Sequence, residues 1–171
     1  LSGDTRYDRV IDISGKQPDL PIIKKFIGAG LVIVVGSSWS SDIDLIKSGL
    51  LKVLETSKII IAPHNVDELE VSELFNKFPN SIRFSETDSI DLANERVMII
   101  DNVGMLSSLY GYADVAYIGG GARGALHNTL EPATWGIPIL FAEHKKNNKF
   151  QEAIALIQNG AAFAISTSQE F

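Results

Sequence analysis

The sequence alternates short runs of consecutive apolar residues with longer stretches in which apolar residues recur every three or four positions. The run Leu31–Val35 contains five apolar residues, most of them β-branched, and such a run is typical of a strand that is covered on both faces. Five further runs predict strands in the same way, at residues 58–62, 97–100, 113–118, 138–141 and 161–165, and residues 81–84 form a shorter candidate.

Amphipathic stretches between these runs predict helices. They cover residues 21–28, 43–55, 66–78, 105–112 and 150–159, and another helix is expected to begin near residue 128 and to end at Gly136. Strands that alternate with helices in this way indicate an α/β domain with a doubly wound, Rossmann-like parallel sheet of about six strands.

The stretch between residues 117 and 141 contains the strongest candidate for a ligand site. A strand leads into three glycines at 119–121, and a helix then begins near Asn128 and Thr129, with Glu131 in its first turn. A glycine loop lets the backbone approach a ligand, a helix start attracts phosphate, and a carboxylate accepts hydrogen bonds from a sugar diol. The alternative is a tight turn capped by Asn128, in which Glu131 only interacts favourably with the helix dipole.

Small or polar residues also follow other predicted strands. Ser37 and Ser38 follow the first strand, Pro63 and His64 follow the second, and Gly104-Met105 comes after the strand at 97–100. Parallel strands present their carboxyl ends along one edge of a sheet, where open α/β folds bind ligands. We therefore expect these residues to converge with the glycine stretch.

Each of these positions also has an ordinary structural explanation. Ser41 or Asp42, just beyond the serines, would then only cap the next helix. A single histidine after a strand, such as His64, is about as often a hydrogen-bonded loop residue as a ligand or an acid–base group.

Composition and charge narrow the function classes. The 171 residues are 45% hydrophobic and 21% charged, which is ordinary for one globular domain. The formal net charge of −6 and the lack of a basic stripe argue against a nucleic-acid partner, and the lysines at 145, 146 and 149 are expected to form a solvated loop. The sequence has no cysteine, and no apolar run reaches the ~20 residues of a transmembrane helix.

Several common catalytic and binding motifs are missing. The sequence has no GxxxxGK[ST] phosphate loop, no GxGxxG after its first strand and no GxSxG elbow. Its three histidines lack the spacing of zinc ligands, so no metal site is expected. The remaining features suit a nucleotide, with a loop and helix start for phosphate, a carboxylate for ribose and backbone for a base.

Motifs spread over nearly the whole chain occur together: Gly3-Asp4-Thr5-Arg6-Tyr7-Asp8, Gly36-Ser37-Ser38-Trp39, Ala62-Pro63-His64, Asp101-Asn102-Val103-Gly104-Met105-Leu106, Leu109-Tyr110-Gly111-Tyr112-Ala113-Asp114-Val115-Ala116 and His127-Asn128-Thr129-Leu130-Glu131-Pro132-Ala133. In this combination the sequence resembles the C-terminal, CMP-Kdo-binding half of the bacterial 3-deoxy-D-manno-octulosonic acid (Kdo) transferases. These enzymes are two-domain GT-B glycosyltransferases of lipopolysaccharide biosynthesis.

The resemblance implies an inverting transfer of Kdo from CMP-Kdo to a lipid A precursor at the cytoplasmic face of the bacterial inner membrane, without a metal or cofactor. It implies that Glu131 holds the ribose, that the backbone near Gly104 and Met105 meets cytosine, and that Arg6 stabilises charge in the transition state. With the residues expected at the sheet edge, the donor site would comprise Ser37, Ser38, Pro63, His64, Gly104, Met105, Leu106, Gly120, Gly121, Asn128, Thr129, Leu130 and Glu131.

Both ends of the sequence suggest part of a longer protein. Residues 1–12 are expected to form an interdomain linker or the start of the domain, and residues 13–171 the donor-nucleotide-binding domain. The general base, the acceptor contacts and the membrane contacts would then belong to an N-terminal domain outside this sequence, so the chain alone should bind donor without turnover. Two alternatives are the donor domain of another GT-B glycosyltransferase that uses a UDP-sugar, and a non-catalytic nucleotide-sugar-binding module of the same fold.

Overall fold

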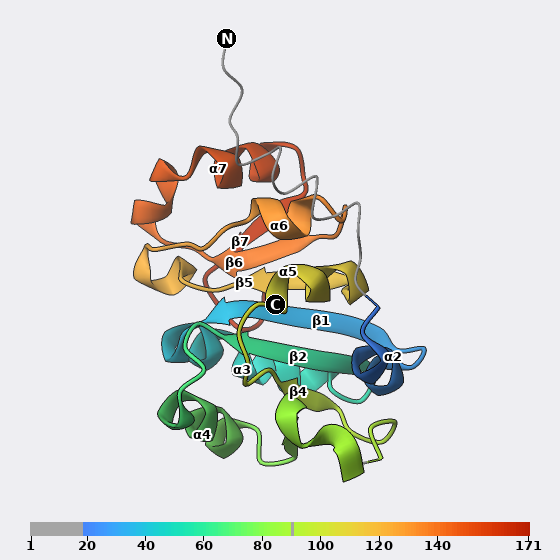
Figure 1. Cartoon of the computed structure of the whole chain (residues 1–171). Coiled ribbons are helices and arrows are strands. Elements are labelled where there is room, and N and C mark those ends of the chain that lie inside the picture. Colours follow the sequence, from blue (N-terminus) through green and yellow to red (C-terminus); the bar gives the residue numbers. More distant parts are fainter. Residues whose placement is uncertain (1–18, 90) are drawn as a thin grey trace.

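The computed structural model describes residues 19–89 and 91–171, which form a seven-stranded sheet with helices on both faces (Figure 1). The strands are β1 (Leu31–Ser38), β2 (Ser57–Pro63), β3 (Ser81–Arg83), β4 (Val97–Ile99), β5 (Val115–Ile118), β6 (Ile139–Ala142) and β7 (Ala162–Ile165). They lie in the order β3-β4-β2-β1-β5-β6-β7, and every pair is parallel. The predicted doubly wound sheet is confirmed, with seven strands instead of about six because the short run near residue 81 forms the edge strand β3.

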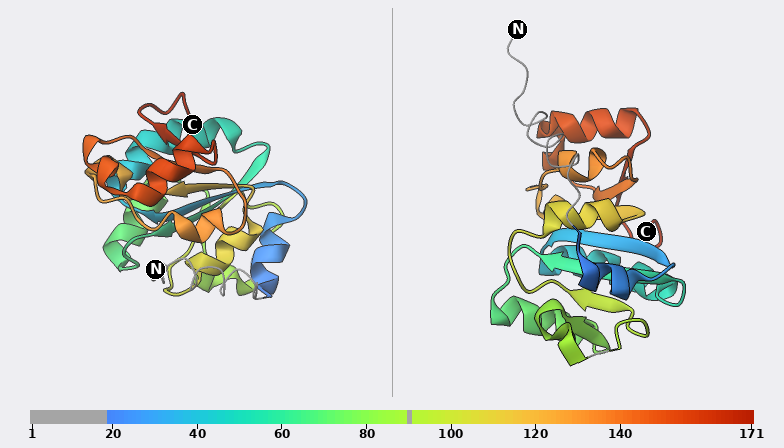
Figure 2. Two further views of the ribbon diagram at one scale, coloured as in Figure 1. Left: turned by 90° about the horizontal axis from the view of Figure 1, so that it is seen from above. Right: turned by 45° about the vertical axis from the view of Figure 1, so that its right-hand side comes forward.

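The helices divide between the two faces of the sheet. One face packs against α3 (Ser40–Val53) and α4 (Glu68–Lys77), and the other against α2 (Pro21–Ile27), α5 (Leu106–Leu109), α6 (Leu130–Ala133) and α7 (Gln151–Gln158). In the left view of Figure 2, α3 and α2 lie on opposite sides of the sheet.

The apolar runs occur because helices cover both faces of the sheet. Successive residues of a strand point to opposite faces, so Ile59 and Ile61 of β2 pack beneath α3 and α4, while Ile60 packs on the other face. All three side chains are fully buried. No helix in the described ranges of the chain is both long and apolar enough to cross a membrane.

Several element boundaries differ from the predictions. Strand β1 continues to Ser38, so the sequence Gly36-Ser37-Ser38 ends a strand instead of opening a loop. The helix predicted at 105–112 is α5 followed by a 3-10 turn, Tyr110–Tyr112. The helix near residue 128 is the single turn α6, and the segment predicted as a surface loop at 86–95 overlaps the end of a 3-10 helix, Phe84–Ser89.

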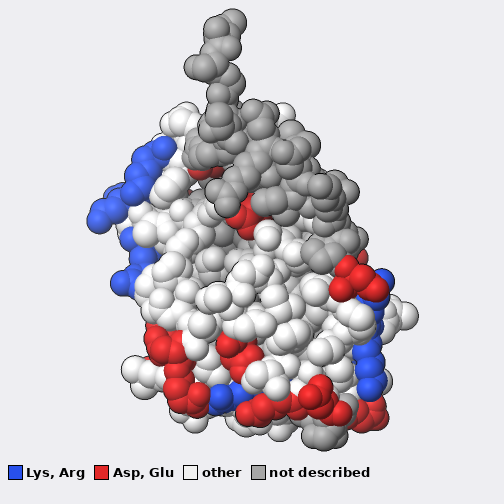
Figure 3. Space-filling model, viewed as in Figure 1, with Lys and Arg blue, Asp and Glu red and all other residues white. Residues whose placement is uncertain are grey.

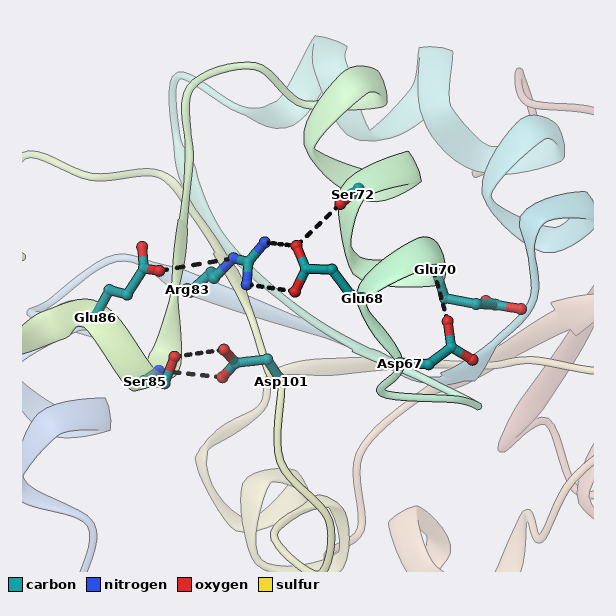
Figure 4. Close-up of polar contacts among 8 residues, drawn as sticks. All are labelled: Asp67, Glu68, Glu70, Ser72, Arg83, Ser85, Glu86 and Asp101. Carbon is teal, nitrogen blue, oxygen red and sulfur yellow. Dashed lines mark hydrogen bonds and ion pairs between the residues drawn. The ribbon is translucent and has the colours of Figure 1, made fainter.

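Polar contacts hold the carboxyl ends of β3 and β4 (Figure 4). The Arg83 guanidinium donates to both carboxylate oxygens of Glu68 at 2.9 and 2.6 Å, and this lowers the pKa of Glu68. Ser85 donates to the Asp101 carboxylate through its backbone N–H at 3.1 Å and its hydroxyl at 2.5 Å. These contacts are exposed to solvent, so they contribute little to the stability of the domain.

Candidate functional site

A cleft of about 380 Å³ opens where the central strands end. Strands β2, β4 and β3 lie on one side of β1, and β5, β6 and β7 lie on the other, so the strand order reverses at β1. The cleft lies at this reversal, which is the position at which open α/β sheets bind ligands. The residues that line it are Ser37, Gly104, Leu106, Ser107, Tyr110, His127, Asn128 and Glu131. Five of these eight were predicted as donor-binding residues, and the structure brings them together from three separate segments.

Ser37 has an unusual backbone in the wall of the cleft. Its φ of 50° is positive, which is uncommon for a residue other than glycine, and it is the bulged residue where the pairing of β1 with β2 shifts register. The neighbouring Gly119 permits this geometry, because a Cβ there would lie 2.2 Å from the Ser37 carbonyl oxygen. Unusual backbone conformations of this kind cluster at ligand sites.

Asn128 and Glu131 form a connected pair at the start of α6. The Asn128 side chain accepts a hydrogen bond from the Leu130 N–H at 3.0 Å and donates to Oε1 of Glu131 at 3.1 Å. The N-cap residue of α6 is Thr129, not Asn128, and its side chain makes no capping hydrogen bond. Asn128 precedes it and satisfies the N–H group of Leu130, and the same side chain orients the Glu131 carboxylate within the cleft that both residues line.

Tyr110 forms part of the buried lining of the cleft. A Cβ at Gly36 would lie only 2.1 Å from the Tyr110 hydroxyl, so glycine in β1 makes room for this ring. The side chain is 2% exposed. Burial raises the pKa of Tyr110, and the negative charge of Glu131 adds to the effect, so the hydroxyl stays protonated.

Asp42 in α3 is a fully buried carboxylate directly beneath the glycine loop. Its Oδ2 accepts hydrogen bonds from the backbone N–H groups of Trp39 at 3.0 Å and Gly120 at 2.9 Å. Its Oδ1 accepts from the Tyr117 hydroxyl at 3.3 Å and from the Ala122 N–H at 3.5 Å. Asp42 therefore caps its own helix, as one alternative predicted, and also anchors the loop.

This arrangement changes the expected role of the glycine loop. The N–H groups of Gly120 and Ala122 point inward to Asp42, so they are not free to bind a phosphate. Gly121 packs against the end of β6, where a Cβ would lie 2.7 Å from the Ala142 carbonyl oxygen. The loop glycines thus serve close packing, and the assignment of Gly120 and Gly121 to the donor site stays a prediction.

Aromatic rings stack beside the cleft. The exposed His64 ring lies against Trp39, with 4.2 Å between ring centroids, and against His127, with 4.6 Å between centroids. The Arg123 guanidinium lies 4.3 Å from the centroid of the Trp39 ring. His64 therefore reaches the site through its stacking on His127 and does not itself line the cleft.

The remaining predicted residues lie close to the cleft but not in its lining. Met105 precedes α5 and packs against the core. Ser38 and Pro63 are buried and paired at the ends of β1 and β2, and Thr129 and Leu130 are buried at the start of α6.

Some residues of the site were not predicted, and one predicted residue cannot be placed. Ser107, Tyr110 and His127 line the cleft and were not predicted to do so, although Tyr110 and His127 stand within the motifs noted above. Arg6, predicted to act on the transition state, lies outside the described residues, as does the proposed linker at 1–12. Within residues 19–89 and 91–171, no three His, Asp or Glu side chains are placed to hold a metal ion.

Charge is unevenly distributed around the domain. On the face shown in Figure 3, Asp and Glu gather along the lower rim, and Lys and Arg lie mainly at the left and right edges. The eight residues that line the cleft include one carboxylate and no Lys or Arg. Positive charge for a phosphate must therefore come from outside this lining.

The fold, a seven-stranded parallel sheet with helices on both faces, matches that of the C-terminal domains of GT-B structures. The chain superposes on the C-terminal CMP-Kdo binding domain of WaaA from Acinetobacter baumannii with a TM-score of 0.72 and 20% identity, covering 95% of this chain and 85% of that one. It superposes on Anabaena HepE in complex with UDP-glucose with a TM-score of 0.60 and 16% identity, covering 94% of this chain and 43% of that one.

Comparison of the sequence with known proteins also finds Kdo transferases. The 3-deoxy-D-manno-octulosonic acid transferase of Aquifex aeolicus is 27% identical over 146 residues, which are 82% of this chain and 40% of that protein. The chain is thus a distant homologue of the Kdo transferases, as its motifs predicted, and it spans about two fifths of the length of this relative. No protein-family model matches the sequence.

Proposed function

We propose that this chain is the donor-binding domain of a Kdo transferase and that it binds CMP-Kdo in the cleft. The observation that carries the proposal is the convergence of Gly104 and Leu106 with the Asn128–Glu131 pair in one cleft. A carboxylate that is already oriented suits the two hydroxyls of a ribose, and an exposed backbone turn suits the edge of a base. The volume of about 380 Å³ is in the range of small-ligand sites.

The complete enzyme would transfer Kdo to a lipid A precursor with inversion at the anomeric carbon. Because the cleft lining has no cation, we assign stabilisation of the departing phosphate and of the Kdo carboxylate to Arg6. The general base, the acceptor site and the contacts with the cytoplasmic face of the inner membrane are assigned to an N-terminal domain. The described chain would then bind donor but not turn it over.

A UDP-sugar donor is the second candidate. It is favoured by the structural likeness to HepE, which was solved with UDP-glucose. An oriented carboxylate such as Glu131 serves the ribose of either nucleotide, so the base and the number of phosphates must discriminate between the two candidates.

Calorimetric titration with CMP, UMP and UDP tests the proposal. Glu131→Ala removes the carboxylate from the cleft, and Glu55→Ala removes an exposed carboxylate that follows α3 and serves as the matched control. We expect the chain to prefer CMP and Glu131→Ala to weaken CMP by about 1–3 kcal/mol, roughly 5- to 150-fold in Kd, while Glu55→Ala has no effect.

The isolated Acinetobacter domain provides a positive control under the same conditions. A preference for UDP would move the assignment to the second candidate. If the control domain bound CMP and this chain bound no nucleotide, the proposed function would be wrong.

A further inference from the structure

A hydrogen bond joins two of the stacked rings beside the cleft. Nε1 of Trp39 donates to Nε2 of His127 at 3.2 Å. His64 lies nearly parallel to both rings, at interplanar angles of 24° and 26°. The indole and the His127 imidazole therefore meet at their edges, and the His64 ring stacks on both of them.

This hydrogen bond determines where His127 carries its proton. An indole N–H can only donate, so Nε2 of His127 must be unprotonated, and the proton of the neutral ring is on Nδ1. Burial lowers the pKa of His127, His64 lowers it further, and Asp42 acts in the opposite direction. A second proton would place two N–H groups against each other, which also favours the neutral ring.

The contacts of the ring place Nδ1 away from the glycine loop and Trp39. A Cβ at Gly120 would lie 2.9 Å from Cδ2 of His127, so the edge formed by Cδ2 and Nε2 faces the glycine loop and Trp39. Nδ1 lies on the opposite side of the ring. Because His127 also lines the cleft, its Nδ1–H is available to a ligand there.

Several N–H groups next to the cleft are already hydrogen-bonded within the domain. The N–H groups of Gly120 and Ala122 are bonded to Asp42, and the Asn128 amide donates to Glu131. Apart from the His127 ring, the remaining side-chain donors among the lining residues are the second N–H of the Asn128 amide and the hydroxyls of Ser37, Ser107 and Tyr110. A nucleotide phosphate, which has only acceptor oxygens when ionised, needs donors of this kind.

We infer that Trp39 is a positioning residue that holds His127 as a neutral Nδ1–H donor, and that this N–H binds a phosphate oxygen of the nucleotide in the cleft. The inference rests on the proposed function for the identity of the ligand. The protonation site of His127 does not depend on it.

The protonation site is measured directly in the free protein. In a long-range ¹H–¹⁵N spectrum of the labelled chain, the two ring nitrogens of a neutral histidine have well-separated shifts that identify the protonated one. His127 is expected to be protonated at Nδ1, and its signals are assigned by their loss in His127→Asn. Trp39→Phe keeps an aromatic ring for His64 but removes the indole N–H, so it should convert His127 to a mixture of both neutral forms. An Nε2–H form in the wild type would overturn the inference.

Binding measurements test the contact with phosphate. In His127→Asn the amide nitrogen takes about the place of Nδ1, whereas in His127→Gln it reaches the place of Nε2. We expect His127→Asn to bind CMP within about threefold of the wild type and His127→Gln to bind it about tenfold more weakly, with cytidine affinity unchanged in both.

The possible results separate the two proposals. Equal losses in the Asn and Gln variants, or an equal loss of cytidine and CMP affinity, would overturn the contact with phosphate. If the wild type bound no CMP, the proposed function and the phosphate contact would both fall, and the ¹H–¹⁵N spectrum would still decide the role of Trp39.

Discussion

Replacing Asp42 by alanine should destabilise the domain by about 2–6 kcal/mol. The change leaves the Gly120 N–H and the Tyr117 hydroxyl buried without their acceptor, and each unpaired buried group costs about 1–3 kcal/mol. Domains of this kind have a total stability of about 5–15 kcal/mol. The loss is therefore a large fraction of the total, and it falls on the loop that forms one side of the site.

Two further variants separate the buried hydrogen bonds from a general effect of losing a carboxylate in α3. Asp42→Asn keeps an acceptor for Gly120 and can donate to the Tyr117 hydroxyl oxygen, so it should cost only about 1 kcal/mol. Asp44→Ala removes an exposed carboxylate two residues along, which pairs with Lys77 at 2.6 Å, and should cost at most about 1 kcal/mol.

Urea unfolding followed by circular dichroism gives the three free energies. The expected order of loss is Asp42→Ala well above Asp42→Asn and Asp44→Ala. If Asp42→Ala stayed within about 1 kcal/mol of Asp44→Ala, the reasoning that Asp42 anchors the loop would be wrong.

Two further predictions concern single positions. Lys58 donates to the carbonyl oxygens of Ala93, at 2.8 Å, and Glu95, so Lys58→Met should lower the free energy of unfolding by about 1–3 kcal/mol in urea. Burial lowers the pKa of Lys58 from its ordinary 10.5, so the unfolded chain keeps this proton to higher pH than the folded chain does. The free energy of unfolding of the wild type, relative to that of Lys58→Met, should therefore rise as the pH approaches 10.5. A difference that does not change with pH would contradict this. Gly120→Ala should lower the melting temperature far more than Gly104→Ala. Both glycines have a positive φ, so both substitutions strain the backbone. A Cβ at Gly120 would in addition lie 2.2 Å from the Ala125 carbonyl oxygen, whereas a Cβ at Gly104 would have no atom within 4 Å. Equal melting temperatures would show that the clash at Gly120 is relieved by movement.

The strands and their order along the chain were predictable because a strand buried on both faces requires a run of consecutive apolar residues. A run such as Leu31–Val35 has no polar position, as is typical of a strand covered on both faces. The convergence of Ser37, Gly104 and Glu131 followed from the same reasoning, since parallel strands end at one edge. The short edge strand β3 was harder to count, because three residues carry little periodic signal.

The internal connections of the site were not predictable in the same way. The bond from Gly120 to Asp42 joins residues 78 positions apart, and the bond from Trp39 to His127 joins residues 88 apart. Local patterns describe neighbours along the chain, so a carboxylate at a helix start was interpreted only as a cap. The glycine triplet suggested phosphate for the same reason, and only the fold shows that its N–H groups face inward.

The position of the cleft between β1 and β5 links ligand binding to folding of the whole domain. The two strands are joined by contacts such as the Asp114 carboxylate with the Val32 N–H, 82 residues away. The walls of the cleft come from the end of β1 and from the segments after β4 and β5. A partly folded chain in which β5 has not reached β1 therefore has no cleft. A nucleotide that binds there stabilises the entire cooperative unit, by about 2.7 kcal/mol at a concentration one hundred times its Kd. The thermal midpoint of the domain is thus a readout of occupancy, and the rise in that midpoint at equal concentrations would rank a panel of nucleotides by affinity.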